Sequence, residues 1–236
     1  MARFLLVHGS CHGAWCWRDV VGLLADAGHV VRALDLPGHG QDRSRPEDVT
    51  LDHYAKAIVD QLDRPTVLVG HSMGGFPIAR AAELACDMVE KLVFVCAYLP
   101  RHGMSLAAMR REAPRQPLLE AIRKSPDGQS FVFDPSQIEE KFYHDCPRGT
   151  LLYALPRLCP QPMRPQAEPI ALGAAFDRVE KHYIVCSNDR AIPPEHQRAM
   201  CAHLPAGHCR EMASSHSPFF SDPVTLAAHL TDIAGH

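Results

Sequence analysis

Short apolar runs alternate along the chain with segments in which apolar residues recur at helical spacing. Runs typical of buried parallel strands lie at 4–7, 30–34, 66–69, 92–98, 181–186 and 209–213. Apolar stripes predict helices at 15–27, 51–62, from the turn after residue 69 to about 85, at 194–203 and at 222–233. Because strands that alternate with helices are joined by right-handed crossovers, this pattern predicts an α/β fold with a doubly wound, mostly parallel sheet.

The alternation stops between about residue 100 and residue 170. Prolines are frequent there, and they exclude sheet strands through most of the stretch. Apolar fragments between the prolines predict helical pieces near 105–111, 117–124, 136–145 and 150–158. We therefore expect a single domain over residues 1–236, with a mainly helical cap inserted at about 100–170.

One stretch of the predicted sheet, residues 66–82, reads as strand, tight turn and helix. Gly70-x-Ser72-x-Gly74 fits the nucleophile-elbow pattern, in which glycines on both sides of the serine allow a sharp reversal of the chain. Gly75 would let the helix approach the strand closely. The pattern alone also fits an ordinary glycine-rich turn, so the rest of the chain must supply a base, an acid and oxyanion donors.

Composition narrows the classes of function. The 236 residues include 24 basic and 27 acidic side chains, a net charge of −3, and no Lys/Arg-rich run, which makes nucleic acid an unexpected partner. The first apolar run is too short for a signal peptide, and no segment has the length of a membrane span. The nine cysteines show no framework spacing, so we expect reduced thiols in a cytoplasmic protein.

A serine nucleophile needs a base, and the base needs an acid to orient it. In elbow enzymes the chain order is Ser, then Asp or Glu, then His. Asp189 follows the predicted strand 181–186, and His216 is the histidine in the loop after the last predicted strand. The alternatives are a plain turn aspartate and a solvated loop histidine. The order and the positions predict a triad of Ser72, Asp189 and His216.

An oxyanion intermediate needs preorganised N–H donors. The residue after the nucleophile, Met73, should supply one from its backbone at a helix N-terminus. The loop after the first strand should supply the second, and Ser10 is our choice there.

The substrate pocket is expected to combine cap residues with aromatic residues of the main domain. These candidate pocket residues are Trp15, Phe76, Met104, Phe133, Phe142, Leu155 and Phe219. Apolar residues at such spacing also fit a plain hydrophobic core.

A metal site in the first loop is an alternative, because the loop holds His8, Cys11, His12 and Cys16, and Cys and His are zinc ligands. Their spacing matches no usual zinc pattern, so neither a metal nor a cofactor is predicted.

Four motifs together resemble the α/β-hydrolase superfamily: 8–17 (HGSCHGAWCW), 70–75 (GHSMGG), 187–189 (SND) and 216–220 (HSPFF). The likeness is greatest to the branch that contains plant methyl-salicylate (salicylic-acid-binding) esterases, hydroxynitrile lyases and small bacterial esterases. The resemblance implies a triad of Ser72, His216 and Asp189 with oxyanion donors at Ser10 and Met73, the same residues that chain order and position select. It also implies a cofactor-free enzyme with a mostly helical cap over an apolar pocket.

The chain departs from the plant lyases at two places. Those lyases carry a lysine directly after the catalytic histidine and a threonine after the first-loop histidine, where this chain has Ser217 and Gly9. The cation that would stabilise a departing cyanide is therefore missing. The cap is also shorter and richer in proline than in the plant enzymes, so their substrates are not implied here.

The sequence thus predicts a serine carboxylesterase that cleaves a small, largely apolar ester, with a carbamate or lactone as variants of the same chemistry. The alternatives are a ligand-binding receptor on a hydrolase scaffold and a hydroxynitrile lyase. The expected partner is a small-molecule ester rather than nucleic acid or a membrane. The oligomeric state is left open, with a homodimer among the options.

Overall fold

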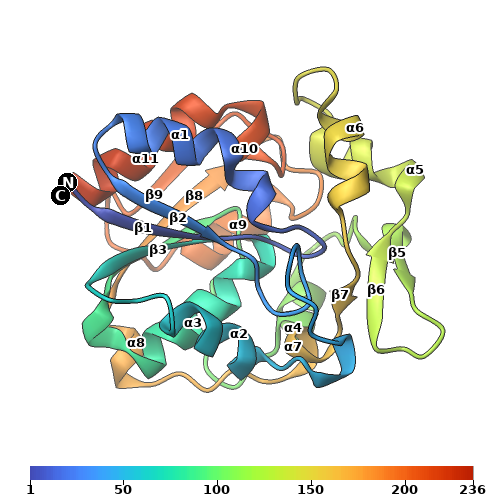
Figure 1. Ribbon diagram of the computed structural model, residues 1–236, viewed down its shortest axis with the longest axis horizontal. Helices are drawn as coiled ribbons and strands as arrows, with labels where there is room; N and C mark the ends of the chain where they lie inside the picture. The colour runs from blue at the N-terminus through green and yellow to red at the C-terminus, as the bar shows by residue number, and fades with distance from the viewer. Residues whose placement is uncertain (236) are drawn as a thin grey trace.

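Six parallel strands form the central sheet of the computed structural model, which describes residues 1–235 (Figure 1). They are β1 (Arg3–Val7), β2 (Val30–Leu34), β3 (Thr66–His71), β4 (Val89–Val95), β8 (Glu180–Cys186) and β9 (Cys209–Met212). Their spatial order is β2-β1-β3-β4-β8-β9, so the chain changes direction across the sheet between β1 and β3. The predicted doubly wound parallel sheet is confirmed. Ligands of such sheets bind at the carboxyl ends of the strands beside this switch point.

Helices cover both faces of the sheet (Figure 1). On one face lie α1 (Arg18–Asp26), α10 (Pro218–Ser221) and α11 (Pro223–Gly235), and on the other lie α2 (Leu51–Val59), α3 (Gly75–Leu84), α8 (Ala174–Arg178) and α9 (Pro194–Cys201). Alternate residues of β1 divide between the two cores: Leu5 and Val7 pack with α2 and α3, whereas Phe4 and Leu6 pack with α1 and α11. Among the described residues, no helix is both long and apolar enough to cross a lipid bilayer.

Strand β4 lies three residues earlier than the predicted strand 92–98, which is a correction. The strand ends at Val95 because Cys96 has a left-handed φ of 35°. The chain then turns towards the elbow, where the Tyr98 N–H donates to the Ser72 carbonyl oxygen at 3.1 Å. Tyr98, predicted as the last residue of a buried strand, instead lies beside the nucleophile turn.

The segment 100–170, called the cap segment below, lies beside the carboxyl ends of the main strands (Figure 1). Its helices are α4 (Leu106–Glu112), α5 (Pro135–Ile138), α6 (Thr150–Ala154) and α7 (Arg164–Ala167). It also contains a small antiparallel sheet of β5 (Ile122–Lys124), β6 (Ser130–Phe133) and β7 (Gln161–Pro162). The helix predicted over 117–124 is therefore wrong for its last residues. Pro162 is tolerated because β7 is an edge strand.

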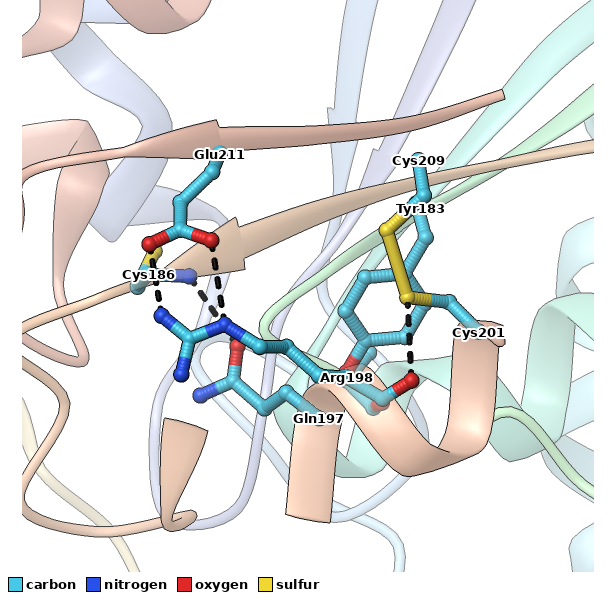
Figure 2. Close-up of a disulfide and its surroundings, with 8 residues drawn as sticks. Tyr183, Cys186, Gln197, Arg198, Cys201, Cys209 and Glu211 are labelled. Atoms are coloured by element: carbon cyan, nitrogen blue, oxygen red, sulfur yellow. Dashed lines mark hydrogen bonds and ion pairs between the residues drawn. A yellow bond between two sulfur atoms is a disulfide. The ribbon is translucent and has the colours of Figure 1, made fainter. Parts of the chain in front are cut away.

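Figure 2 shows a disulfide between Cys201, at the end of α9, and Cys209, at the start of β9. The expectation that all nine cysteines are reduced thiols is therefore wrong for this pair. An ion pair between Arg198 and Glu211, with an N–O distance of 2.6 Å, joins the same two elements. Both α9 and β9 pack against β8, which brings the two sulfurs together. The spacing of these cysteines in the sequence does not predict the bond.

Candidate active site

Ser72 occupies the sharp turn between β3 and α3. It is a non-glycine residue with φ of 54°, a left-handed conformation that side chains rarely adopt. A Cβ atom at Gly70 would lie 2.6 Å from the carbonyl oxygen of Gly74, and one at Gly75 would overlap the carbonyl oxygen of Tyr98. Because both positions need glycine, the sequence pattern and the strained serine turn have the same steric cause.

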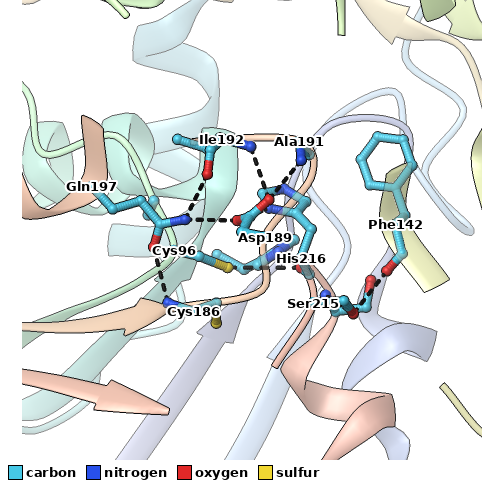
Figure 3. A network of polar contacts seen from close by, with 12 residues as sticks. Cys96, Phe142, Cys186, Asp189, Ala191, Ile192, Gln197, Ser215 and His216 are labelled. Atoms are coloured by element: carbon cyan, nitrogen blue, oxygen red, sulfur yellow. Dashed lines mark hydrogen bonds and ion pairs between the residues drawn. The ribbon is translucent and has the colours of Figure 1, made fainter. Parts of the chain in front are cut away.

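His216 and Asp189 form a buried pair at the ends of β9 and β8. The His216 Nδ1 lies 2.7 Å from the Asp189 Oδ2 (Figure 3). His216 is fully buried and Asp189 is 5% exposed. An aspartate in this position fixes the imidazole with its proton on Nδ1, which leaves Nε2 free to accept a proton.

Asp189 accepts four hydrogen bonds in total, so its charge is well solvated by the protein. The backbone N–H groups of Ala191 and Ile192 donate to Oδ1 at 2.7 and 2.9 Å. The Gln197 Nε2 donates to Oδ2 at 2.7 Å, the same oxygen that faces His216 (Figure 3). These donors hold the carboxylate in one orientation.

Gln197 was not found from the sequence. Its side chain is fully buried, and beyond Asp189 it bonds the Ile192 carbonyl oxygen at 2.8 Å and the Cys186 N–H at 3.0 Å. It therefore ties the end of β8 to the loop that carries the aspartate. A polar residue one turn into the helix that follows this loop was the available signal, but such residues are usually solvated.

Ser72 and His216 line one cavity at the switch point of the sheet. The His216 Nε2 is buried and has no hydrogen-bond partner among residues 1–235, so it makes no bond to Ser72. The His216 carbonyl oxygen accepts from the His71 Nε2 at 2.7 Å, which ties the histidine loop to the elbow strand. Burial holds the pKa of His71 well below its usual value, so this ring is a neutral donor.

The two expected oxyanion donors, Ser10 and Met73, also line this cavity. In the described part of the chain, no hydrogen bond occupies the backbone N–H of either residue. The Ser10 side chain accepts from the Gln166 Nε2 at 2.8 Å, and the Ser10 carbonyl oxygen lies 2.8 Å from the His12 Nδ1. The side chain and the carbonyl oxygen of Ser10 are therefore held by hydrogen bonds, and its backbone N–H remains available.

His12 joins the first loop to the cap segment. Its Nε2 lies 2.6 Å from the hydroxyl of Tyr143, and its Nδ1 donates to the Ser10 carbonyl oxygen. Burial lowers the pKa of His12 to about 4, so the ring is neutral at physiological pH. A neutral ring with Nδ1–H can accept the Tyr143 hydroxyl proton, which satisfies both groups.

The cavity walls come from both parts of the fold. Ser10, Ser72, Met73 and His216 were placed in the lining above. The other lining residues are His12, His71, Tyr98, Leu106, Arg110, Leu118, Ile122, Phe131, Phe133, Phe142 and Gln166. Phe133 and Phe142 thus lie where the sequence analysis expected them, with ring centroids 4.7 Å apart. Phe142 also faces His216 at 5.5 Å. Arg110, Tyr98 and Gln166 were missed because a single polar residue carries no periodic signal.

The other five candidate pocket residues do not line the cavity, which corrects that prediction. Trp15 stacks on His12 at 5.2 Å, behind the lining. Phe76 and Phe219 are buried in the two cores of the sheet. Met104 packs against the core on the α3 side, and Leu155 is 36% exposed. Their apolar spacing reflected core packing and surface rather than the pocket.

The four first-loop residues considered as metal ligands do not gather in one place. Among residues 1–235, two sets bring three potential ligand atoms within 4.8 Å, and none of His8, Cys11, His12 and Cys16 belongs to either. The sets are His71, Cys96 and His216, and Glu180, His182 and His208.

Comparison with protein families gives a match over residues 4–229 to the alpha/beta hydrolase family. Methylesterase 3 of Arabidopsis thaliana is 33% identical over 98% of this chain and 95% of its own length. Esterase PIR7B of Oryza sativa subsp. japonica is 33% identical with the same coverage. Methyl jasmonate esterase 1 of Vitis vinifera is 29% identical over 98% of this chain and 96% of its own.

Solved structures show the same architecture. A pyrethroid hydrolase from Sphingobium faniae JZ-2 superposes with a TM-score of 0.88 and 26% identity, over 99% of this chain and 97% of its own. Polyneuridine aldehyde esterase also gives 0.88 and 26%, over 99% of both chains. The α/β-hydrolase fold and the esterase branch predicted from the sequence are thereby confirmed.

Proposed function

The chain belongs to the alpha/beta hydrolase family, and we propose that it is a serine esterase that cleaves a small, largely apolar carboxylic ester through an acyl-enzyme on Ser72. Its relatives are named methylesterases and methyl jasmonate esterase, which supports a simple alkyl ester as substrate. Carbamates and lactones need the same attack on a carbonyl and belong to the same proposal.

In the proposed reaction the Ser72 hydroxyl attacks the ester carbonyl carbon while the His216 Nε2 takes its proton. The N–H groups of Ser10 and Met73 stabilise the oxyanion that forms. Asp189 keeps the His216 proton on Nδ1 and stabilises the imidazolium. The intermediate then expels the alcohol, which receives the proton from Nε2. Water repeats the cycle on the acyl-enzyme, releases the carboxylic acid and restores Ser72.

The single observation that carries the proposal is the state of His216. Its Nδ1 is bonded to Asp189 at 2.7 Å, and its buried Nε2 has no partner among the described residues while it lines the cavity with Ser72. The buried Nδ1 of His71 also has no partner among residues 1–235, but among the histidines of the lining it is His216 that pairs with a carboxylate. A base must keep one nitrogen free for the substrate's proton.

We further propose that the cap segment closes over this cavity and sets the substrate's size, since more than half of the lining comes from it. The cytoplasm remains the proposed compartment because seven cysteines are free. The proposed partner is the ester alone.

Pre-steady-state kinetics with p-nitrophenyl butyrate test the mechanism. We expect a burst of one p-nitrophenolate per protein molecule, followed by a slower steady state as the acyl-enzyme is hydrolysed. Ser72→Ala should abolish both phases, and Ser44→Ala, at an exposed serine, should preserve them. Full activity in Ser72→Ala would overturn the proposal. Tight binding of an aromatic acid without any turnover would indicate a ligand-binding receptor instead.

A further inference from the structure

Arg110 on α4 is the single Lys or Arg side chain in the lining of the cavity that holds Ser72 and His216. The rest of the cap segment's contribution is apolar apart from Gln166. Arg110 is half-buried, and its Nε is shielded from solvent, so part of the guanidinium has lost water without gaining a bond in its place. Its presence there needs an explanation that ester hydrolysis alone does not give.

The ion pairs of the described residues leave Arg110 without a counter-ion. Among residues 1–235, no carboxylate lies within 4.0 Å of its guanidinium, and its buried Nε has no hydrogen-bond partner. The neighbouring arginines differ: Arg101 binds Glu112 at 2.5 Å, and Arg115 binds Glu195 at 2.7 Å. Carboxylates are therefore available near α4, yet they pair with other side chains and leave Arg110 free.

Arg110 and Tyr98 both line the cavity, and the Arg110 charge acts on the Tyr98 hydroxyl. Burial raises the pKa of the Tyr98 hydroxyl, and the nearby Arg110 charge opposes that rise. Tyr98 belongs to the lining as well, and its backbone N–H is bonded to the Ser72 carbonyl oxygen at 3.1 Å. Arg110 thus belongs to the same cavity lining as Tyr98 and Ser72, together with the apolar side chains of Leu106 and Leu118.

We propose that Arg110 binds a carboxylate of the substrate, so that the preferred substrates are esters that carry a free carboxylate separated from the ester carbonyl by an apolar chain. The inference rests on the proposed function and names its substrate class. A guanidinium offers parallel N–H donors that match a carboxylate in geometry and charge. A chain of methylene groups suits the apolar side chains that the cap segment contributes to the lining. Half-esters of dicarboxylic acids have this chemistry.

The test compares pairs of esters that differ only in the distant charge. Monomethyl succinate, adipate and suberate place the carboxylate at increasing distance on the acyl side, and methyl butanoate, hexanoate and octanoate are their neutral partners. Acetyl esters of glycolate and 6-hydroxyhexanoate place the carboxylate on the alcohol side, and ethyl acetate and hexyl acetate are their neutral partners. For each pair the ratio of kcat/KM, charged over neutral, is measured in the wild type, in Arg110→Met and in Arg111→Met.

Arg110→Met should lower this ratio at least about tenfold for the best half-ester, through KM, because a charge-assisted hydrogen bond is lost. Arg111 is exposed on the same helix, so Arg111→Met should leave the ratio unchanged. The arm that shows the effect identifies the side of the ester that carries the carboxylate. Equal losses for charged and neutral esters in Arg110→Met, or no preference for a half-ester at any chain length, would overturn the inference.

A binding measurement separates this inference from the hydrolysis itself. In a Ser72→Ala background, which prevents turnover, calorimetric affinity for monomethyl suberate should fall at least about tenfold on adding Arg110→Met. If the wild type cleaves no ester, the proposed function fails, but this arm still decides the inference. Equal affinity with and without Arg110→Met would overturn it.

Discussion

The two walls of the cavity differ in how their side chains are held. In the sheet wall, formed by Ser72 and His216, each residue follows a strand and is fixed through hydrogen bonds or backbone geometry. In the cap wall, formed by Arg110, Phe133 and Phe142, the aromatic rings are held by packing against one another. The sheet wall is therefore suited to fixed reaction geometry, and the cap wall to a shape that substitutions can alter.

The walls meet at a few polar contacts. Asp145 of the cap segment accepts from the Ser215 N–H at 2.7 Å, next to His216, and Tyr143 contacts His12 at 2.6 Å. Because these contacts involve the backbone and neighbouring side chains, they position the cap without using the proposed catalytic atoms. Substitutions in the sheet wall should therefore change kcat, whereas substitutions in the cap wall should change KM and substrate preference.

The largest expected effect is in the sheet wall. Asp189→Asn should lower kcat for p-nitrophenyl butyrate by about 10⁴-fold, because an amide can donate to His216 and hold the ring in the wrong tautomer. KM should change little. Steady-state kinetics measure both constants, with Asp177→Asn, an exposed carboxylate at the other end of β8, as the control. A loss below about tenfold would contradict the assigned role.

The junction of the walls should be sensitive to acid. The folded-state pKa of His12 is about 4, below the unfolded value of about 6.5, so its contribution to stability is present above pH 6.5 and lost as pH falls towards 4. At pH 5 the loss amounts to about 2 kcal/mol. The free energy of unfolding, measured in urea, should fall between pH 7.5 and pH 5.0. This fall should be smaller by about 2 kcal/mol in His12→Gln.

His8 and His71 are also buried with a pKa lowered mainly by burial, and they contribute in the same direction in both proteins. An identical drop in the wild type and in His12→Gln would show that His12 is not the responsible group.

The cap wall should respond in KM. Phe133→Ala removes an apolar face of the cavity, so KM for a butyrate ester should rise about tenfold, with kcat within about threefold. Esters with longer acyl chains should regain part of the loss by filling the space. Val132, the neighbour on β6, is 41% exposed, so Val132→Ala is the matched control in an acyl-chain series. A fall in kcat without a change in KM would break the division between the walls.

The smallest effect concerns Gln197, which acts through Asp189. Gln197→Leu removes one donor from the carboxylate oxygen that faces His216, which strengthens that oxygen as an acceptor. The acid limb of the kcat/KM profile should move to higher pH. Gln197→Glu, which also loses the donor, should move it further. Arg198→Gln, on the same helix, should leave the profile in place, and equal shifts in Arg198→Gln and Gln197→Leu would indicate a purely structural role.

The sheet wall follows largely from local sequence rules. Buried strands have a short apolar pattern, glycines at 70, 74 and 75 leave no room for side chains, and chain order then selects Asp189 and His216. Each inference depends on a few adjacent residues. That is why the sheet, the elbow and the pairing of His216 with Asp189 were within reach of the sequence.

The cap wall could not be read in the same way. Strands β5, β6 and β7 have two to four residues each, too short for an alternating pattern to stand out. Arg110 belongs to the cavity because α4, which packs against α7, lines it together with residues of the elbow, a consequence of tertiary contacts. The same holds for the disulfide of Cys201 and Cys209, which depends on where α9 and β9 meet.

The central claim, a covalent intermediate on Ser72, can be tested by intact-protein mass spectrometry. The protein is mixed with p-nitrophenyl butyrate, quenched in acid within the burst phase and weighed. We predict the addition of one butyryl group, located by proteolysis on the peptide that contains Ser72 and absent in Ser72→Ala. Turnover of the ester with no acyl group on Ser72, or with the group on another residue, would contradict the account.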